Sequence, residues 1–223
     1  TYTNEQDIGI HTRIINFINN FIAKQKKDIF GFPQPIFKDP FISFSTDFIS
    51  RKYNTKVIVI IRHPAAVVDS FLKIGWKIDF APILEQNTLI DEILYPFKKN
   101  LNVDLNKKTN IEKISLLWLF FYDYLVKLVE RNPERYYLVK HENLSYNPID
   151  EYKEIYDFLN ISYTNKLRKS IYYYSHSDKT EPSVNNPLNI NRDSKKIIDR
   201  WKRNLQQDYL DKIENITKPL SYH

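Results

Sequence analysis

The pattern of apolar and polar positions predicts short strands that alternate with helices. Residues 57–61 are an unbroken β-branched run, too short for a helix and apolar on both faces, as in a buried parallel strand. A helix is predicted directly after it, over 65–73, because Pro64 suits a first helical turn and apolar side chains recur on one face. This spacing predicts Arg62 at the carboxyl end of a central strand and Ser70 about two turns into the next helix.

The chain before residue 57 is predicted to contain two helices and one further strand. Apolar spacing indicates a helix over roughly 5–27, a short strand at 35–38 and a second helix from 41 to about 53. Strands that alternate with helices favour right-handed crossovers and a parallel sheet. On this interpretation Lys38 leaves its strand at the same edge of the sheet as Arg62.

The region after residue 73 has weaker periodicity at first. Residues 74–110 are predicted to be an insertion that either carries an acceptor-binding surface or caps the core. The same two alternatives apply to its aromatic residues, which either stack on an acceptor or pack inside: Trp76, Phe80, Tyr95 and Phe97. A long amphipathic helix is predicted over 111–130 and a second strand over 135–140.

The last third of the chain is predicted to be helical around one long loop. The Asn147-Pro148 pair marks a turn and a helix start, and residues 172–192 are polar enough to form a loop. A final helix is predicted from Asp193, followed by a further short helix around 209–216.

Composition narrows the chemistry. The 223 residues include 33 Lys and Arg against 27 Asp and Glu, and the net charge of +6 suits an anionic ligand. Because the charges are of mixed sign along the chain, no nucleic-acid partner is expected; the alternative, a basic nucleic-acid-binding domain, would need its lysines and arginines on one face. The absence of cysteine excludes a disulfide or thiolate metal site, and the five histidines lack a metal-binding spacing, so no metal is expected. No apolar run approaches the roughly 20 residues of a membrane-spanning helix.

Glycine usage bears on phosphate binding. The three glycines are scattered, so the sequence contains no glycine-rich phosphate loop. The chain also begins at Thr1 without a methionine, which leads us to expect a fragment. A phosphate is nevertheless a plausible ligand for Arg62 and Ser70, because ligands bind at this edge of open α/β sheets. The alternative is an arginine that ends a strand and pairs with a carboxylate.

Four stretches in one order carry a recognisable pattern. An apolar strand runs into an arginine, a proline and then a serine eight residues after the arginine. The stretches are Phe-Lys-Asp-Pro-Phe at 37–41, Val-Ile-Ile-Arg-His-Pro-Ala-Ala-Val-Val-Asp-Ser at 59–70, Tyr-Leu-Val-Lys-His-Glu-Asn-Leu-Ser-Tyr-Asn-Pro at 137–148 with Ile-Tyr-Asp-Phe-Leu at 155–159, and Arg192-Asp-Ser194 with Arg200-Trp201. Together they resemble the sulfotransferases that use 3′-phosphoadenosine 5′-phosphosulfate (PAPS), with the Lys-Asp-Pro segment of the bacterial and tyrosylprotein branch.

The resemblance implies a fold and an activity. It implies one α/β domain over residues 1–223, with a P-loop-NTPase-like parallel sheet flanked by helices, whose N-terminal strand, phosphosulfate-binding loop and helix are missing. The implied enzyme transfers a sulfuryl group from PAPS to a hydroxyl or amine of a glycan, small molecule or peptide. It releases adenosine 3′,5′-bisphosphate, needs no metal, and is expected in the cytoplasm unless a membrane anchor precedes Thr1. The alternative is a non-catalytic nucleotide-binding remnant or interaction module of the same fold.

The resemblance also implies roles for residues. Arg62 and Ser70 would hold the 3′-phosphate, Arg192 with Ser194 would close over it, and Lys38 would stabilise charge at the transferring sulfuryl group. His141 stands where relatives have a tyrosine beside the adenine, so it either contacts the base or packs at a strand end.

Two further positions bear on the same resemblance. Trp201 is expected to anchor the C-terminal loop by packing. Pro40 occupies the place of the histidine base of phenol-type relatives, so the sequence names no general base.

Overall fold

The computed structural model describes residues 36–38, 43–101, 103–176, 195 and 198–220. The chain divides into two compact units, Thr1–Ile42 and Ser43–His223. In the first unit the described residues 36–38 form neither helix nor strand, so the strand predicted at 35–38 is wrong for these three. Prolines stand at both ends of this segment, and a proline cannot donate to a strand ladder. The helix predicted over 5–27 lies outside the described residues.

In the described part of the second unit, two parallel strands form the sheet. β1 (Val57–Ile61) pairs with β2 (Tyr136–Lys140), in a register that runs from Val57 opposite Tyr136 to Ile61 opposite Lys140. Both strands and their parallel pairing are therefore confirmed. Because the strands run the same way, the residues that follow them, Arg62 and His141, leave the sheet at the same edge.

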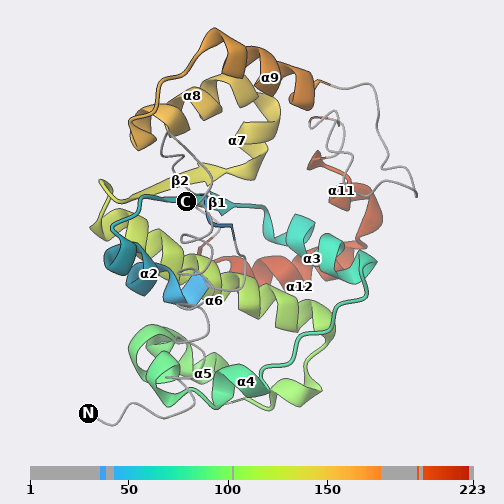
Figure 1. Ribbon diagram of the computed structural model, residues 1–223. Coiled ribbons are helices and arrows are strands. Elements are labelled where there is room, and N and C mark those ends of the chain that lie inside the picture. Colours follow the sequence, from blue (N-terminus) through green and yellow to red (C-terminus); the bar gives the residue numbers. More distant parts are fainter. Residues whose placement is uncertain (1–35, 39–42, 102, 177–194, 196–197, 221–223) are drawn as a thin grey trace. The chain divides into compact units, whose positions relative to one another are not determined.

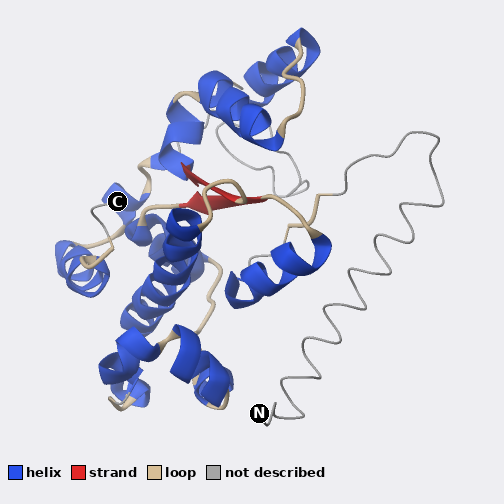
Figure 2. Ribbon diagram, turned by 90° about the vertical axis from the view of Figure 1, so that its left-hand side faces the viewer, coloured by secondary structure: helices blue, strands red, loops and turns tan. Residues whose placement is uncertain are grey.

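Helices lie on both faces of this sheet (Figures 1 and 2). On one face, the long helix α6 (Asn110–Arg131) packs on β2. The helices α3 (Pro64–Lys73) and α12 (Gln207–Thr217) pack against α6. On the other face lie three shorter helices, which are α7 (His141–Tyr146), α8 (Pro148–Leu159) and α9 (Asn165–Ser175). This mixed α/β architecture, with a parallel sheet between helices, is the fold class that the sequence predicted.

The core follows the apolar stripe of α6. Ile114, Trp118, Leu125 and Leu128 of this helix are buried, which confirms the amphipathic helix predicted over 111–130. The helix begins with a capping box in which Thr109 and Glu112 satisfy each other's backbone N–H groups, which fixes where the stripe starts. The helix α2 (Thr46–Tyr53) precedes β1, and Tyr136 donates to Asp47 at its start with an O···O distance of 2.8 Å.

The insertion at 74–110 is a chain of short turns. Phe80 and Phe97 pack on Phe120 of α6, whereas Trp76 and Tyr95 stay exposed. Two of the four aromatic residues therefore belong to the core. The elements are α4 (Ala81–Leu84), a π-helical turn (Leu89–Ile93), α5 (Lys98–Leu101), and 3-10 turns at Tyr95–Phe97 and Leu105–Lys107.

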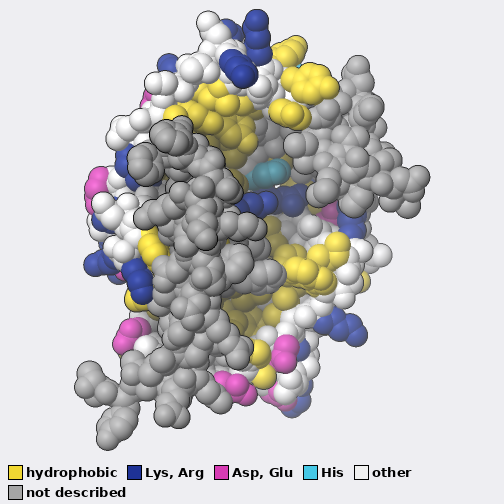
Figure 3. All heavy atoms as spheres, viewed as in Figure 1, with side chains coloured by type: hydrophobic (Ala, Val, Ile, Leu, Met, Phe, Trp, Pro, Cys, Tyr) yellow, Lys and Arg dark blue, Asp and Glu magenta, His cyan; other side chains and the backbone are white. Residues whose placement is uncertain are grey.

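The C-terminal third differs from its prediction in two places. Helix α9 continues to Ser175, so residues 172–175 are helical and not part of a loop as predicted, and its three consecutive tyrosines are exposed. Figure 3 shows hydrophobic side chains exposed at the upper right of the molecule. The helix predicted from Asp193 is not continuous, because residues 199–200 form a turn before α11 (Trp201–Asn204). Helix α12 confirms the last predicted helix. Among the described residues, no helix has the length and apolar character to cross a membrane.

Candidate functional site

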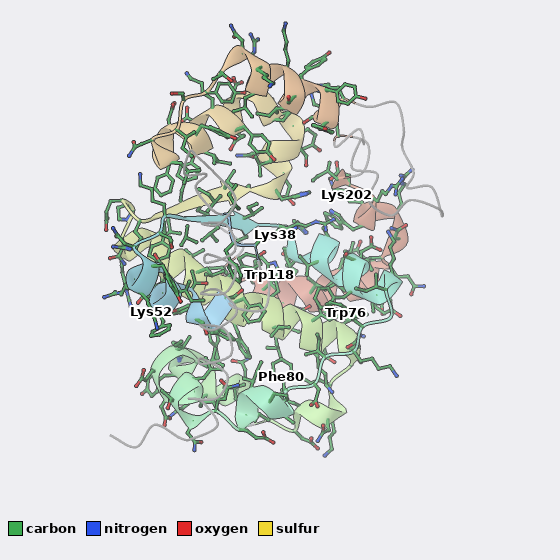
Figure 4. The ribbon with its side chains drawn as sticks, viewed as in Figure 1. Lys38, Lys52, Trp76, Phe80, Trp118 and Lys202 are labelled. Atoms are coloured by element: carbon green, nitrogen blue, oxygen red, sulfur yellow. The ribbon has the colours of Figure 1, made fainter. Side chains whose placement is uncertain are left out.

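Two aromatic side chains of α6 form hydrogen bonds to the backbone where β1 turns into α3. The indole Nε1 of Trp118 donates to the carbonyl oxygen of Arg62 at 2.9 Å, and the hydroxyl of Tyr122 donates to the carbonyl oxygen of Ile60 at 3.0 Å. Trp118 thus lies between α6 and the end of the strand (Figure 4). These bonds use the carbonyl groups that the sheet leaves unpaired, so the direction in which Arg62 leaves the strand is fixed by buried aromatic residues.

The start of α3 is fixed from the side of β2. The backbone N–H of His63 donates to Glu142 of α7 at 3.0 Å, which ties the two strand ends together. The imidazole Nδ1 of His63 accepts from the backbone N–H of Ala65 at 3.2 Å and so caps α3. His63 acts here as Asp or Ser does at other helix starts, immediately before the predicted Pro64.

A cavity of about 300 Å³ opens at this edge of the sheet. This volume is at the small end of the roughly 300–1,000 Å³ of ligand pockets. Three residues predicted from the sequence, Arg62, Ser70 and His141, line it together although they come from three different elements. The described lining residues are Arg62, Asp69, Ser70, Lys73, His141, Ile198, Arg200 and Trp201.

Two side chains that line this cavity each have a buried nitrogen without a hydrogen-bond partner among the described residues. These nitrogens are the Nε of Arg62 and the Nδ1 of His141. A buried donor without a partner costs about 1–3 kcal/mol, so folded proteins rarely retain one without a use. Oxygen atoms of an anionic ligand would satisfy the guanidinium directly.

The electrostatics of the cavity favour an anion. Three cationic side chains and one carboxylate are among its described lining residues, and the positive charge of Arg62 acts on His141. Burial, and then this charge, lower the pKa of His141, so its imidazole is neutral at physiological pH. Burial is also the main cause that lowers the pKa of His63.

Trp201 both packs and lines the cavity. Its ring stacks on the imidazole of His63, with centroids 4.3 Å apart and an interplanar angle of 12°. The sequence predicted the packing role, and the structure adds a wall of the cavity.

Sequence reasoning missed other lining residues, including Lys73, Asp69 and Arg200. For Lys73 a signal was available, because a residue three positions after Ser70 shares its helix face.

Three predicted site residues are not among the described lining of this cavity. Lys38 belongs to the first unit, whereas the cavity belongs to the second. Arg192 and Ser194 lie outside the described residues.

A second hollow, of about 490 Å³, lies along α9. Its described lining comes from that helix alone, namely Asn165, Lys166, Lys169, Ser170, Tyr173 and Tyr174.

Comparisons with known proteins agree with the architecture. A solved structure described as "Sulfotransferase Domain from the Curacin Biosynthetic Pathway" is similar, with a TM-score of 0.51 and 18% sequence identity. The match covers 83% of this chain and 62% of that one, so this chain spans less than two thirds of its length. No curated protein matches the sequence. The family model described as "Sulfotransferase domain" matches residues 40–222, and the chain therefore belongs to the sulfotransferase domain family.

Proposed function

We propose that this protein is a PAPS-dependent sulfotransferase whose cavity at the carboxyl ends of β1 and β2 binds the 3′-phosphate of the nucleotide. The single observation that carries the proposal is that Arg62 lines a cationic cavity while its buried Nε has no hydrogen-bond partner among the described residues. A guanidinium held in this way suits a phosphate dianion, because it can offer parallel donors to two oxygens.

Other lining residues support the same ligand. The hydroxyl of Ser70 lies on the same helix that begins beside Arg62 and can donate to a phosphate oxygen. The neutral imidazole of His141 carries one N–H donor and one acceptor nitrogen, which suits the ring nitrogens of an adenine or an ester oxygen. The ring of Trp201 adds an apolar wall.

The chemistry of the reaction asks little more of the protein than binding and fixed charge. PAPS supplies the sulfuryl group, which an acceptor hydroxyl or amine attacks in line while negative charge develops on the leaving phosphate. Arg62 and Ser70 hold the donor at its 3′ end, and this orients the reacting end without taking part in bond cleavage. Lys38, Arg192 and Ser194 keep the roles that the resemblance implies for them. The acceptor belongs to the same proposal and is a glycan, a small molecule or a peptide.

A transfer assay tests this function. The full chain is incubated with PAPS carrying a radioactive sulfur and with a panel of glycans, phenols and tyrosine peptides, and labelled products are separated from free nucleotide. Transfer to one class, with release of adenosine 3′,5′-bisphosphate, is the expected result. Binding of adenosine 3′,5′-bisphosphate without any transfer would instead favour the nucleotide-binding remnant, for which the absence of a glycine-rich loop in the sequence is the supporting observation. Absence of both binding and transfer would contradict the proposal.

A further inference from the structure

Asp69 is an unexpected residue for an anion site. It lines the cavity next to Ser70, and only 8% of its surface is exposed. A carboxylate in this position would repel a phosphate if its charge were not compensated. Its bonding partners therefore decide whether it opposes the site or helps to build it.

Both oxygens of Asp69 are occupied by donors from two different elements. The ammonium of Lys73, one turn later on α3, donates to Oδ2 at 2.8 Å. The side-chain amide of Asn204, at the end of α11, lies 3.1 Å from each carboxylate oxygen. The negative charge is thus paired with a cation, and its hydrogen-bonding capacity is used away from the ligand.

These bonds join two walls of the cavity. Asn204 is 135 positions from Asp69 in the sequence, and the turn and helix before it carry Arg200 and Trp201. Lys73 lies on the opposite wall, on the same helix as Ser70. The carboxylate of Asp69 therefore holds the ammonium of Lys73 on α3 and also holds α11, which follows Arg200, against α3.

We propose that Lys73 is a further phosphate-binding residue of this site and that Asp69 is the positioning residue that holds Lys73 and α11 around the 3′-phosphate. The inference rests on the proposed function. A lysine side chain that is already held by an ion pair loses less conformational freedom when a ligand binds. The side chain of Lys73 stays half-exposed, and its ammonium has further donors for a second oxygen. The pair should therefore raise the preference for nucleotides that carry a 3′-phosphate.

The chain contains a matched pair that lacks the site. Asp123 and Lys127 on α6 have the same spacing, are joined at 2.6 Å, and have side-chain exposures of 19% and 41%, against 11% and 52% for Asp69 and Lys73. Neither residue lines the cavity. Variants of Asp123 and Lys127 therefore measure how much stability is lost when such an ion pair is removed away from the cavity.

The test compares two ligands by calorimetry, adenosine 3′,5′-bisphosphate and adenosine 5′-phosphate, which lacks the 3′-phosphate. Lys73→Ala is expected to weaken binding of the bisphosphate about 10-fold and of the monophosphate less than 2-fold, because one charge-assisted contact is lost. Lys73→Arg should restore most of the difference. Asp69→Asn should reduce the same preference, and Asn204→Ala should weaken both ligands, since the wall with Trp201 loosens.

The controls separate this inference from the function on which it rests. Lys127→Ala and Asp123→Asn should lower the melting temperature about as much as their counterparts and leave both affinities unchanged. If the unaltered chain shows no preference for the bisphosphate, or if Arg62→Ala keeps that preference, the proposed function is wrong. If Arg62→Ala abolishes the preference while Lys73→Ala and Asp69→Asn keep it within 2-fold, only the inference about Lys73 and Asp69 is overturned.

Discussion

The two hollows of the second unit differ in how they are built. The one along α9 is larger, yet its described lining residues come from a single helix. The cavity at the strand ends is smaller, but it gathers residues from the end of β1, from α3, from α7 and from the C-terminal segment. Only the latter contains buried nitrogens without partners, as far as the described residues go. The strand-end cavity is therefore the better candidate for a ligand site, because several distant elements meet there around polar atoms without partners. The larger volume of the α9 hollow does not outweigh this difference.

The largest expected effect comes from removing the guanidinium at the strand end. Arg62→Ala should weaken binding of adenosine 3′,5′-bisphosphate roughly 10²- to 10⁴-fold, because two charge-assisted hydrogen bonds are lost, each worth roughly 1.5–3 kcal/mol. Isothermal titration calorimetry measures the change. Lys166→Ala on α9 removes a cationic side chain that lines the other hollow and should leave the affinity unchanged. A comparable loss in both variants would erase the distinction between the two hollows.

The second effect concerns the buried nitrogen of His141. His141→Ala should weaken binding of the same nucleotide about 10-fold, since one contact to the ligand is lost. His141→Asn places an amide group near the position of Nδ1 and should recover most of that loss. If the two variants bind equally well, His141 packs at the strand end and does not contact the nucleotide.

A smaller effect is expected on the pH dependence of stability. Burial lowers the pKa of both His63 and His141 below the ordinary value of 6.5, so the folded state binds these protons less well than the unfolded state. The stability that comes from keeping both imidazoles neutral is fully present above pH 6.5. It is lost as the pH falls through the pKa values that His63 and His141 have in the folded state. Urea denaturation at pH 7.5, 6.5 and 5.5 should show a falling free energy of unfolding. The double variant His63→Asn/His141→Asn should have a flatter profile, and an equal slope would contradict the assigned cause.

The smallest effect is expected in the hollow along α9. Lys169→Ala and Tyr173→Ala change two residues that line it, and we expect less than 2-fold change in the affinity for adenosine 3′,5′-bisphosphate. Fluorescence or calorimetric titration is sufficient for this measurement. A 10-fold loss in either variant would move the nucleotide site to α9.

The sequence predicted those parts of the site that depend on local order. An apolar strand, one arginine and a proline-started helix are encoded by neighbouring residues, so Arg62 and Ser70 could be assigned to one edge of the sheet. Asp69 and Asn204 could not be paired in advance, because their contact depends on how α11 returns to α3 across 135 positions. Local periodicity carries no information about such a return.

Two errors in the predicted secondary structure, a strand that is not formed and a helix that was missed, come from short segments. The strand assigned to 35–38 gave more weight to two apolar residues than to the nearby prolines, which cannot supply ladder hydrogen bonds. The helix α7 begins immediately after β2 and was missed, because its six residues are too few to show a period of 3.6. Consequently His141 was predicted at the end of a strand, and it is in fact the first residue of a helix.

A crystal structure of the full chain with adenosine 3′,5′-bisphosphate tests the central claim most directly. The account predicts 3′-phosphate oxygens within about 2.7–3.2 Å of the Nε of Arg62, between α3 and the C-terminal segment. A nucleotide seated along α9, or one in the strand-end cavity with its 3′-phosphate turned away from Arg62, would contradict it.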